Sequence, residues 1–132
     1  MISLAYAAGF FDGEGTVSVP KRKVKEKYYY RLNVSVSNTY RKTLEEFQVA
    51  FGGQIYNDTN YVNKPLFSWQ INGQEAAKFL QQIEPFLAEK RSQAWLGMEY
   101  SALTVARDTS EYQQALREGF HLALQLEKRN GF

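Results

Sequence analysis

Two acidic residues near the start of the chain, Asp12 and Glu14, carry groups that could take part in metal chemistry. Carboxylate oxygens are ligands that hard divalent cations prefer. Residues 4–15, LAYAAGFFDGEG, predict a helix that ends on these acids, although a helix dipole favours cations at that end. The middle of this helix is built from alanine and glycine, which are too small to anchor a core. The structural alternative is that DGEG simply forms a turn between a helix and a strand.

A second group of residues that could bind a ligand is the basic segment 20–31, PKRKVKEKYYYR. It holds six Lys or Arg residues and one Glu, whereas the whole chain has a formal net charge of only +2. Such a run is compatible with a solvated loop. It is equally compatible with a surface that binds a polyanion, and nucleic acid is the polyanion that this charge pattern favours.

The composition narrows the classes of protein that fit. The chain has 132 residues, 44% hydrophobic and 23% charged, which predicts one globular domain over residues 1–132. No apolar run is long enough to span a bilayer, and the N-terminus lacks the pattern of a signal peptide, so we expect no membrane partner and no targeting signal. Without Cys, disulfides, Cys-based zinc sites and thiol catalysis are excluded. The single His, His121, argues against a His-based metal site or a Ser-His triad and is predicted to be an ordinary helix residue.

Hydrophobic periodicity predicts the order helix, two strands, helix, two strands, helices. Two strands around the basic loop form a first hairpin, and a second hairpin surrounds residues 59–65. Asn38 or Thr39 is expected to cap the helix between them, Gly52 and Gly53 to end it, and Pro85 to interrupt the next helix. The expected strands are 16–19, 28–37, 54–58 and 66–71, and the expected helices are 4–15, 39–51, 74–87, 89–105 and 110–131. This order predicts an α+β, αββαββα fold in which helices cover one face of a four-stranded antiparallel sheet.

The other face of this sheet is predicted to be polar in an informative way. Alternation directs Val17, Val19, Leu32, Val34, Val36, Ile55, Phe67, Trp69 and Ile71 inward. The outward side chains are Thr16, Ser18, Tyr29, Arg31, Asn33, Ser35, Gln54, Tyr56, Asp58, Ser68 and Gln70. A face that serves only solubility is usually dominated by Lys and Glu, whereas these groups can hydrogen-bond to base edges beside a loop that reaches phosphates. Polar outer faces are also ordinary, so this feature alone does not decide the function.

Residues 7–15, AAGFFDGEG, resemble the signature motif of the LAGLIDADG homing endonucleases. Small residues, an acid and glycines stand at the positions where that family has them. The departures are Ala7 for the leading leucine, Phe10 and Phe11 for the aliphatic pair, and Glu14 where Asp is more common. The order of elements, the basic hairpin and the chain length fit as well, so the resemblance extends over nearly the whole chain.

The resemblance implies a homodimer that cuts a long pseudo-palindromic double-stranded DNA site inside the cell, in cytoplasm or an organelle matrix. The motif helices would pack together through Leu4, Ala5, Ala8, Gly9 and Asp12. Glu14 and the Gly13 carbonyl would bind Mg²⁺ or Mn²⁺, Ca²⁺ would bind without supporting cleavage, and no small-molecule cofactor is expected. The residues predicted to contact DNA are Ser18, Lys21, Arg22, Lys23, Lys25, Lys27, Tyr29, Arg31, Asn33, Ser35, Gln54, Tyr56, Asp58, Ser68 and Gln70.

The resemblance also assigns roles around the expected metal site. Residues 83–94, IEPFLAEKRSQA, resemble the segment that places a lysine there, which identifies Lys90 as a catalytic candidate beside Glu14. Asn38 and Lys42 resemble the polar and basic residues that order water near the scissile phosphate, with Arg41 as a competitor. Asp12 is expected to be structural, through hydrogen bonds around the helix end.

Two other classes of protein compete with this interpretation. The same fold serves as a DNA-binding regulator or an RNA maturase without cleavage, although the presence of Glu14 and Lys90 favours a nuclease. A restriction-type metal nuclease would need an E-x-K element, and no Glu in this sequence has Lys two residues later.

Overall fold

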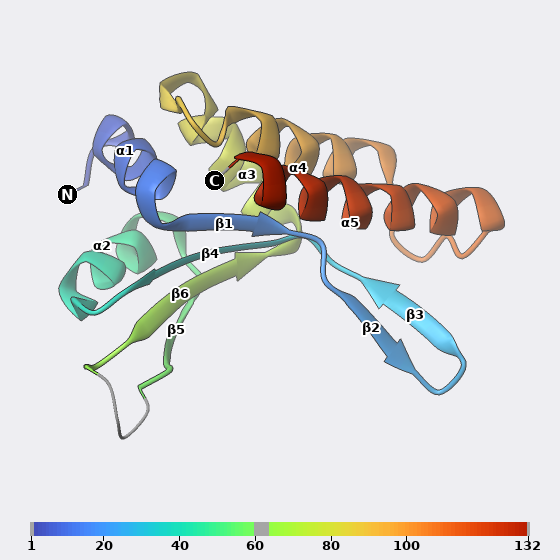
Figure 1. Cartoon of the computed structure of the whole chain (residues 1–132), viewed down its shortest axis with the longest axis horizontal. Coiled ribbons are helices and arrows are strands. Elements are labelled where there is room, and N and C mark those ends of the chain that lie inside the picture. Colours follow the sequence, from blue (N-terminus) through green and yellow to red (C-terminus); the bar gives the residue numbers. More distant parts are fainter. Residues whose placement is uncertain (1, 60–63, 132) are drawn as a thin grey trace.

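The computed structural model describes residues 2–59 and 64–131, and the predicted loop tip at 60–63 lies outside the described residues. Figure 1 shows helices gathered on one side of a sheet and a separate two-stranded ribbon at one end. The helices are α1 (Leu4–Glu14), α2 (Arg41–Phe51), α3 (Gly73–Ile83), the 3₁₀ turn η1 (Glu84–Phe86), α4 (Arg91–Leu103) and α5 (Glu111–Gly131). The strands are β1 (Gly15–Ser18), β2 (Lys21–Val24), β3 (Lys27–Tyr30), β4 (Asn33–Asn38), β5 (Gln54–Asn57) and β6 (Phe67–Asn72).

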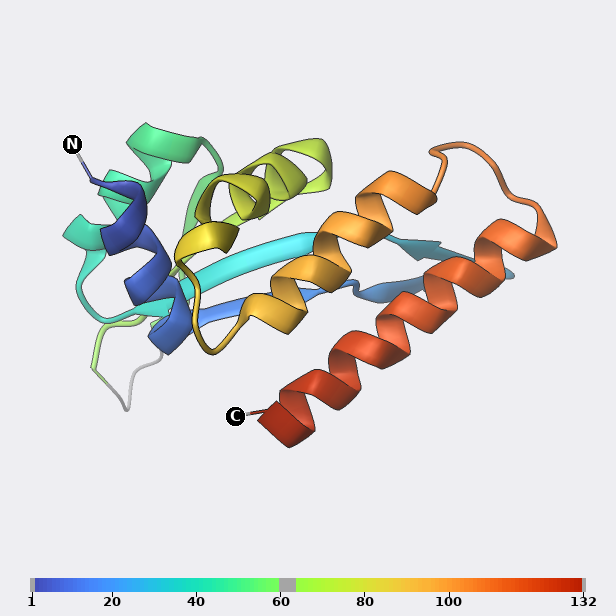
Figure 2. The same cartoon turned by 90° about the horizontal axis from the view of Figure 1, so that it is seen from above.

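The main sheet has the strand order β1-β4-β6-β5, and every neighbouring pair is antiparallel. Val17 lies opposite Val34, and Val36 lies opposite Trp69, so the buried residues of adjacent strands share the helix-covered face. Figure 2 shows α4 crossing this face and α5 running beside α4. The predicted α+β fold and its four-stranded antiparallel sheet are confirmed.

Aromatic side chains form the centre of the core beneath α2 and α3. Phe79 packs against Phe47, Phe51 and Trp69 with ring centroids 4.7 to 6.2 Å apart. The Trp69 indole N–H donates to the Gly52 carbonyl at 2.7 Å, which satisfies the one polar atom of that ring. Gly52 and Gly53 have φ values of 83° and 89°, a backbone that side chains disfavour, so they end α2 as predicted.

Most of the basic segment is a β-ribbon, and the prediction that residues 20–27 form a loop was wrong. β2 and β3 pair with each other in their own two-stranded sheet, and the predicted single strand 28–37 is divided between β3 and β4 at residues 31–32. The turn between them places Lys25 at a φ of 58°. The lysine run hid the alternation of the ribbon, because both faces of an exposed ribbon can be polar.

The other boundaries differ from the predictions by a few residues. Tyr40 precedes α2 as its N-cap, and the Asn38 side chain accepts from the Tyr40 N–H at 2.8 Å, so neither Asn38 nor Thr39 caps the helix. Pro85 lies in the 3₁₀ turn that interrupts the helical run, as expected. Ser110 accepts from the Gln113 N–H at 3.3 Å and caps α5, also as expected. Within the described residues, no helix combines the length and apolar character needed to cross a membrane.

Candidate active site and nucleic-acid interface

Asp12 joins the end of α1 to the start of α4. Its carboxylate accepts hydrogen bonds from the backbone N–H groups of Ala88, Glu89 and Lys90 at 2.8, 3.1 and 3.0 Å. The N–H groups at a helix start lack intrahelical partners, so a carboxylate there stabilises the approach to α4. Asp12 therefore has the geometry of a structural residue, and its partners lie in the segment that leads into α4.

The Lys90 side chain makes a second connection between these two segments. Its backbone forms the N-cap of α4, while its ammonium donates to the Asp12 carbonyl oxygen at 2.7 Å. That oxygen belongs to the last turn of α1, where carbonyl groups and the helix dipole both attract cations. Lys90 thus places a positive charge at the acidic end of α1, two residues from Glu14.

Glu14 is the last residue of α1, and it is exposed. Because three N–H groups occupy the Asp12 carboxylate, Glu14 is the acid of this motif that is available to a ligand. Gly13 lies in the same last turn, where a carbonyl oxygen can add a second hard donor. These oxygens fit a divalent cation such as Mg²⁺. Across residues 2–59 and 64–131, no group of three His, Cys, Asp or Glu residues could hold a metal.

The end of β4 borders the same region. Gly15 lies opposite Val36, so β4 continues past the start of β1 toward Asn38. Asn38 is half-buried, and Lys42 is exposed in the first turn of α2. The competitor Arg41 pairs with Glu45 at 3.1 Å and lies 5.4 Å from the Phe67 ring centroid. Lys42 is therefore the better placed of the two basic residues to meet a ligand.

The exposed face of α1 carries only part of the predicted dimer contact set. Ala5 and Gly9 are exposed, and Leu4 is 38% exposed. Ala8, by contrast, is 0% exposed within the single chain, because it faces the core with Ala7 and Phe11. We therefore remove Ala8 from the predicted contact set. Open space surrounds the position that a Cβ would take at Gly9.

The outer face of the sheet presents a polar row that crosses all four strands. Thr16 lies opposite Ser35, Ser35 opposite Gln70, and Gln70 opposite Gln54. None of these four residues is buried. Ser68 differs from the prediction, because it is only 3% exposed and accepts a hydrogen bond from Gln70 at 3.3 Å. The remaining predicted contacts near this face, Ser18, Asn33, Tyr56 and Asp58, are at least partly exposed. Tyr29 and Arg31 are exposed too, but the prediction that they lie on this face was wrong, because Tyr29 belongs to β3 of the separate ribbon and Arg31 lies between β3 and β4.

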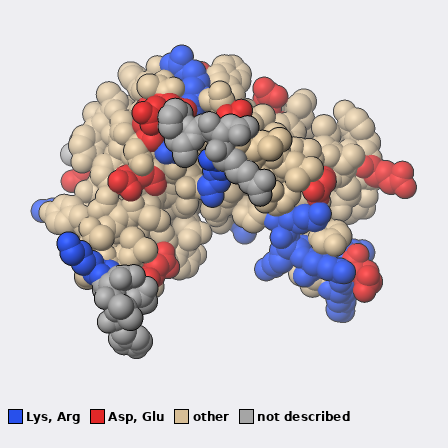
Figure 3. Space-filling view, in the orientation of Figure 1, with Lys and Arg blue, Asp and Glu red and all other residues tan. Residues whose placement is uncertain are grey.

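Basic side chains gather on the β2–β3 ribbon, as Figure 3 shows. The same view shows the lower side of the molecule hollowed between this ribbon and the β5–β6 end of the sheet. All five predicted phosphate contacts of the ribbon are exposed: Lys21, Arg22, Lys23, Lys25 and Lys27. Lys21 is nevertheless engaged by Glu118 of α5 at 2.6 Å, a partner that the sequence did not indicate.

The comparisons with known proteins agree with this geometry. The LAGLIDADG endonuclease family model matches residues 7–93. The intron-encoded RNA maturase bI4 of Saccharomyces cerevisiae is 34% identical over 79 residues, which is 54% of this chain and 11% of that protein. The chain thus spans about a tenth of the length of this curated relative.

Solved structures of homing endonucleases share the fold. The I-CvuI structure in complex with DNA has a TM-score of 0.81 and 19% identity, covering 93% of this chain and 80% of that chain. The archaeal intron-encoded I-Vdi141I, also complexed with DNA, has a TM-score of 0.81 and 17% identity, covering 98% of this chain and 86% of that chain. This chain shares with these endonucleases a fold whose four-stranded sheet follows a first helix, α1, and α1 ends in an acidic motif. The chain belongs to the LAGLIDADG endonuclease family.

Proposed function

We propose that this protein is a homodimeric endonuclease that cuts a long pseudo-palindromic double-stranded DNA site with the help of Mg²⁺ or Mn²⁺. The observation that carries the proposal is the end of α1. There, an exposed Glu14 carboxylate lies two residues from the carbonyl that holds the Lys90 ammonium. The pairing of an acid for a metal with a cation for a phosphate suits phosphodiester hydrolysis.

Glu14 and the Gly13 carbonyl would hold the metal ion, and a second copy of the chain would supply the same pair. Two carboxylates brought close together repel each other unless a divalent cation lies between them. When bound, such ions activate water and stabilise the leaving oxygen of an in-line displacement. Asn38 and Lys42 would order water at the edge of this site. Ca²⁺ is expected to bind to the same oxygens without supporting cleavage.

Lys90→Ala tests the proposed role of the ammonium. We expect cleavage to slow by about tenfold or more, because the charge matters most as the phosphate becomes pentavalent. DNA binding should change little, and the Asp12 carboxylate keeps its three backbone donors. Single-turnover cleavage at saturating protein, with binding measured separately in Ca²⁺, gives the answer. Equal losses of cleavage and of binding would assign Lys90 to binding alone.

The outer sheet face and Arg31, which lies between β3 and β4, would read the bases, while the ribbon would contact phosphates. Arg31→Ala and Gln70→Ala should relax preference at particular base pairs, by about 1–3 kcal/mol for a good bidentate contact. Arg22→Gln should instead weaken binding to all sequences. A binding profile over single-base variants of the site separates the two effects, and uniform weakening by Arg31→Ala would remove that residue from base readout.

A selection for cleaved sites in a random DNA library with Mg²⁺ tests the proposed function directly. The expected result is cut sites with dyad symmetry, because a twofold dimer presents the same sheet to each half-site. Enriched but uncut sites would contradict the nuclease and support a DNA-binding regulator. Cut sites without dyad symmetry would contradict readout by a homodimer.

RNA maturation is the second candidate function, and the 34% identity to the yeast RNA maturase favours it. A maturase would stabilise a folded intron RNA, and the ribbon could contribute to that binding as well as to DNA binding. Splicing of the host intron, measured with and without the purified protein, decides this point. If the chain is encoded in an intron, the nuclease would serve intron homing, and both activities could occur in one protein.

A further inference from the structure

The β2–β3 ribbon has little apolar support of its own. Every residue of β2 and β3 is exposed except Tyr30, which is half-buried, and the two strands pair only with each other. An isolated two-stranded hairpin is at best marginally stable in water. Contacts with the rest of the protein must therefore fix the direction in which this basic ribbon extends.

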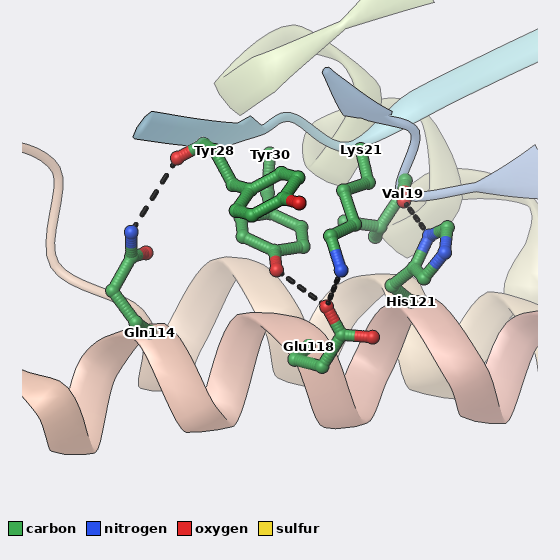
Figure 4. Close-up of polar contacts among 7 residues, drawn as sticks. All are labelled: Val19, Lys21, Tyr28, Tyr30, Gln114, Glu118 and His121. Carbon is green, nitrogen blue, oxygen red and sulfur yellow. Dashed lines mark hydrogen bonds and ion pairs between the residues drawn. The ribbon is translucent and has the colours of Figure 1, made fainter. Parts of the chain in front are cut away.

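One face of α5 supplies these contacts, as Figure 4 shows. Gln114, Glu118 and His121 are spaced i, i+4 and i+7, so they lie in one stripe along the helix. Gln114 donates to the Tyr28 carbonyl at 3.4 Å. His121 contacts the Val19 carbonyl, just before the ribbon, through Nδ1 at 2.7 Å, and that nitrogen is the donor because a carbonyl oxygen only accepts.

Glu118 is the member of this stripe that joins both strands. A single oxygen, Oε1, accepts from the Tyr30 hydroxyl at 2.5 Å and from the Lys21 ammonium at 2.6 Å. Lys21 of β2 lies directly opposite Tyr30 of β3, so Glu118 ties together the cross-strand pair where the ribbon leaves the sheet. The side chains of Lys21 and Glu118 are 30% and 34% exposed.

The titration behaviour of these groups agrees with the contact. Hydrogen bonding to Lys21 and then to Tyr30 lowers the pKa of the Glu118 carboxyl below its ordinary value. Hydrogen bonding to Glu118 raises the pKa of Lys21, and burial followed by the bond to Glu118 raises the pKa of Tyr30. Lys21 is thus charged but already paired.

We propose that Glu118 is a positioning residue that holds the basic ribbon in the direction needed to follow DNA. Lys21 then serves as part of this anchor and not as a phosphate contact. Arg22, its neighbour, lies opposite Tyr29 on the other side of the ribbon and remains available for phosphate. The part of this proposal that concerns DNA rests on the proposed function.

Glu118 lies outside the segment that matches the family model. The family match ends at residue 93, whereas α5 begins at Glu111. In this proposal, α5, which lies beyond the matched segment, orients the β2–β3 ribbon, which lies within that segment. The sequence offers the spacing of Gln114, Glu118 and His121 as a signal, but nothing in the spacing names the ribbon as their partner.

Hydrogen exchange of the ribbon amides in the free protein tests the anchor without DNA. Glu118→Gln removes the charged partner of Lys21, and we expect the β2 and β3 amides to exchange several-fold faster while the amides of the main sheet stay unchanged. Glu127→Gln is the matched control, since it removes the same charge from the same helix, and Glu127 forms no ion pair among the described residues. Unchanged ribbon exchange in Glu118→Gln would overturn the anchor.

The direction in which DNA affinity changes distinguishes a positioning role of Glu118 from the general effect of removing a negative charge. Removing an acid near a polyanion should strengthen binding, as we expect for Glu127→Gln, whereas loss of the anchor should weaken binding by Glu118→Gln roughly threefold or more. Arg22→Gln should reduce the magnitude of the slope of log K against log salt by about 0.9 per subunit, and Lys21→Gln should leave the slope unchanged. A slope reduced equally by both would identify Lys21 as a phosphate contact and contradict the proposal.

Exchange of the two charges completes the test. Lys21→Glu alone places two acids together and should release the ribbon, while Lys21→Glu combined with Glu118→Lys restores an ion pair and should recover ribbon protection and affinity. Failure of the combined variant to recover either quantity would count against a pairwise anchor. If the unsubstituted protein does not bind DNA, the proposed function fails, and the exchange measurements still decide whether Glu118 anchors the ribbon.

Discussion

Glu14→Gln is expected to abolish DNA cleavage while leaving DNA binding intact or slightly stronger. The amide keeps the size of the side chain but removes the charge that offsets a divalent cation. We expect a loss of at least about 10³-fold, or about 4 kcal/mol of transition-state stabilisation, because the metal both generates the nucleophile and stabilises the leaving oxygen. Binding is retained because one fewer acid faces the phosphates. Single-turnover cleavage in Mg²⁺ and equilibrium binding in Ca²⁺ measure the two quantities.

Asp12→Asn is the matched comparison, since it makes the same chemical change two residues away. The Asp12 carboxylate accepts three backbone N–H bonds, and an amide at that position would turn a donor toward one of these donors. We expect the free energy of unfolding to fall by about 1–3 kcal/mol while metal affinity per folded molecule is unchanged. Calorimetry of unfolding and metal titration separate the two variants. Full cleavage by Glu14→Gln, with the loss confined to Asp12→Asn, would place the metal on the other acid.

The parts of the fold that the sequence predicted are those set by local patterns. Period-two alternation identified the buried face of the sheet, because Val17, Val34 and Val36 can be buried on one side only. Gly52 and Gly53 ended α2 where a positive φ was needed. Such features depend on a few adjacent residues, so they survive without knowledge of the distant contacts.

The parts that the sequence did not predict depend on residues far apart in the chain, or on a helix whose two faces have the same types of residue. The bonds from Asp12 to the start of α4 span more than 70 positions, and the contact between Tyr30 and Glu118 spans 88. On α1, alanine and glycine occur on both faces, so the pattern could not show that Ala8 is buried while Gly9 is exposed. Candidate catalytic residues could be named from the motif, whereas the residues that position them required the structure.

Gly9→Leu is expected to separate the proposed dimer without harming the fold of one chain. A Cβ at Gly9 meets no atom within 4 Å in the single chain, so the subunit accommodates a larger side chain. Replacing glycine in a helix interior should even stabilise the subunit, by up to about 1 kcal/mol. In a twofold interface, each substitution occurs twice. Overpacking of about 1–3 kcal/mol per site therefore raises the dimer dissociation constant by roughly 30-fold to 10⁴-fold.

Gly119→Leu is the control for this experiment, because Gly119 is also an exposed helical glycine with open space around its Cβ position. It should share the stabilising effect on the helix and leave association unchanged. Sedimentation at several concentrations measures the dissociation constant, and thermal unfolding reports the stability of the subunit. Because Glu14 lies at the end of the same helix, cleavage of both strands should disappear together with the dimer in Gly9→Leu. A Gly9→Leu protein that sediments as a monomer and still cuts both strands would show that one chain holds a complete active site.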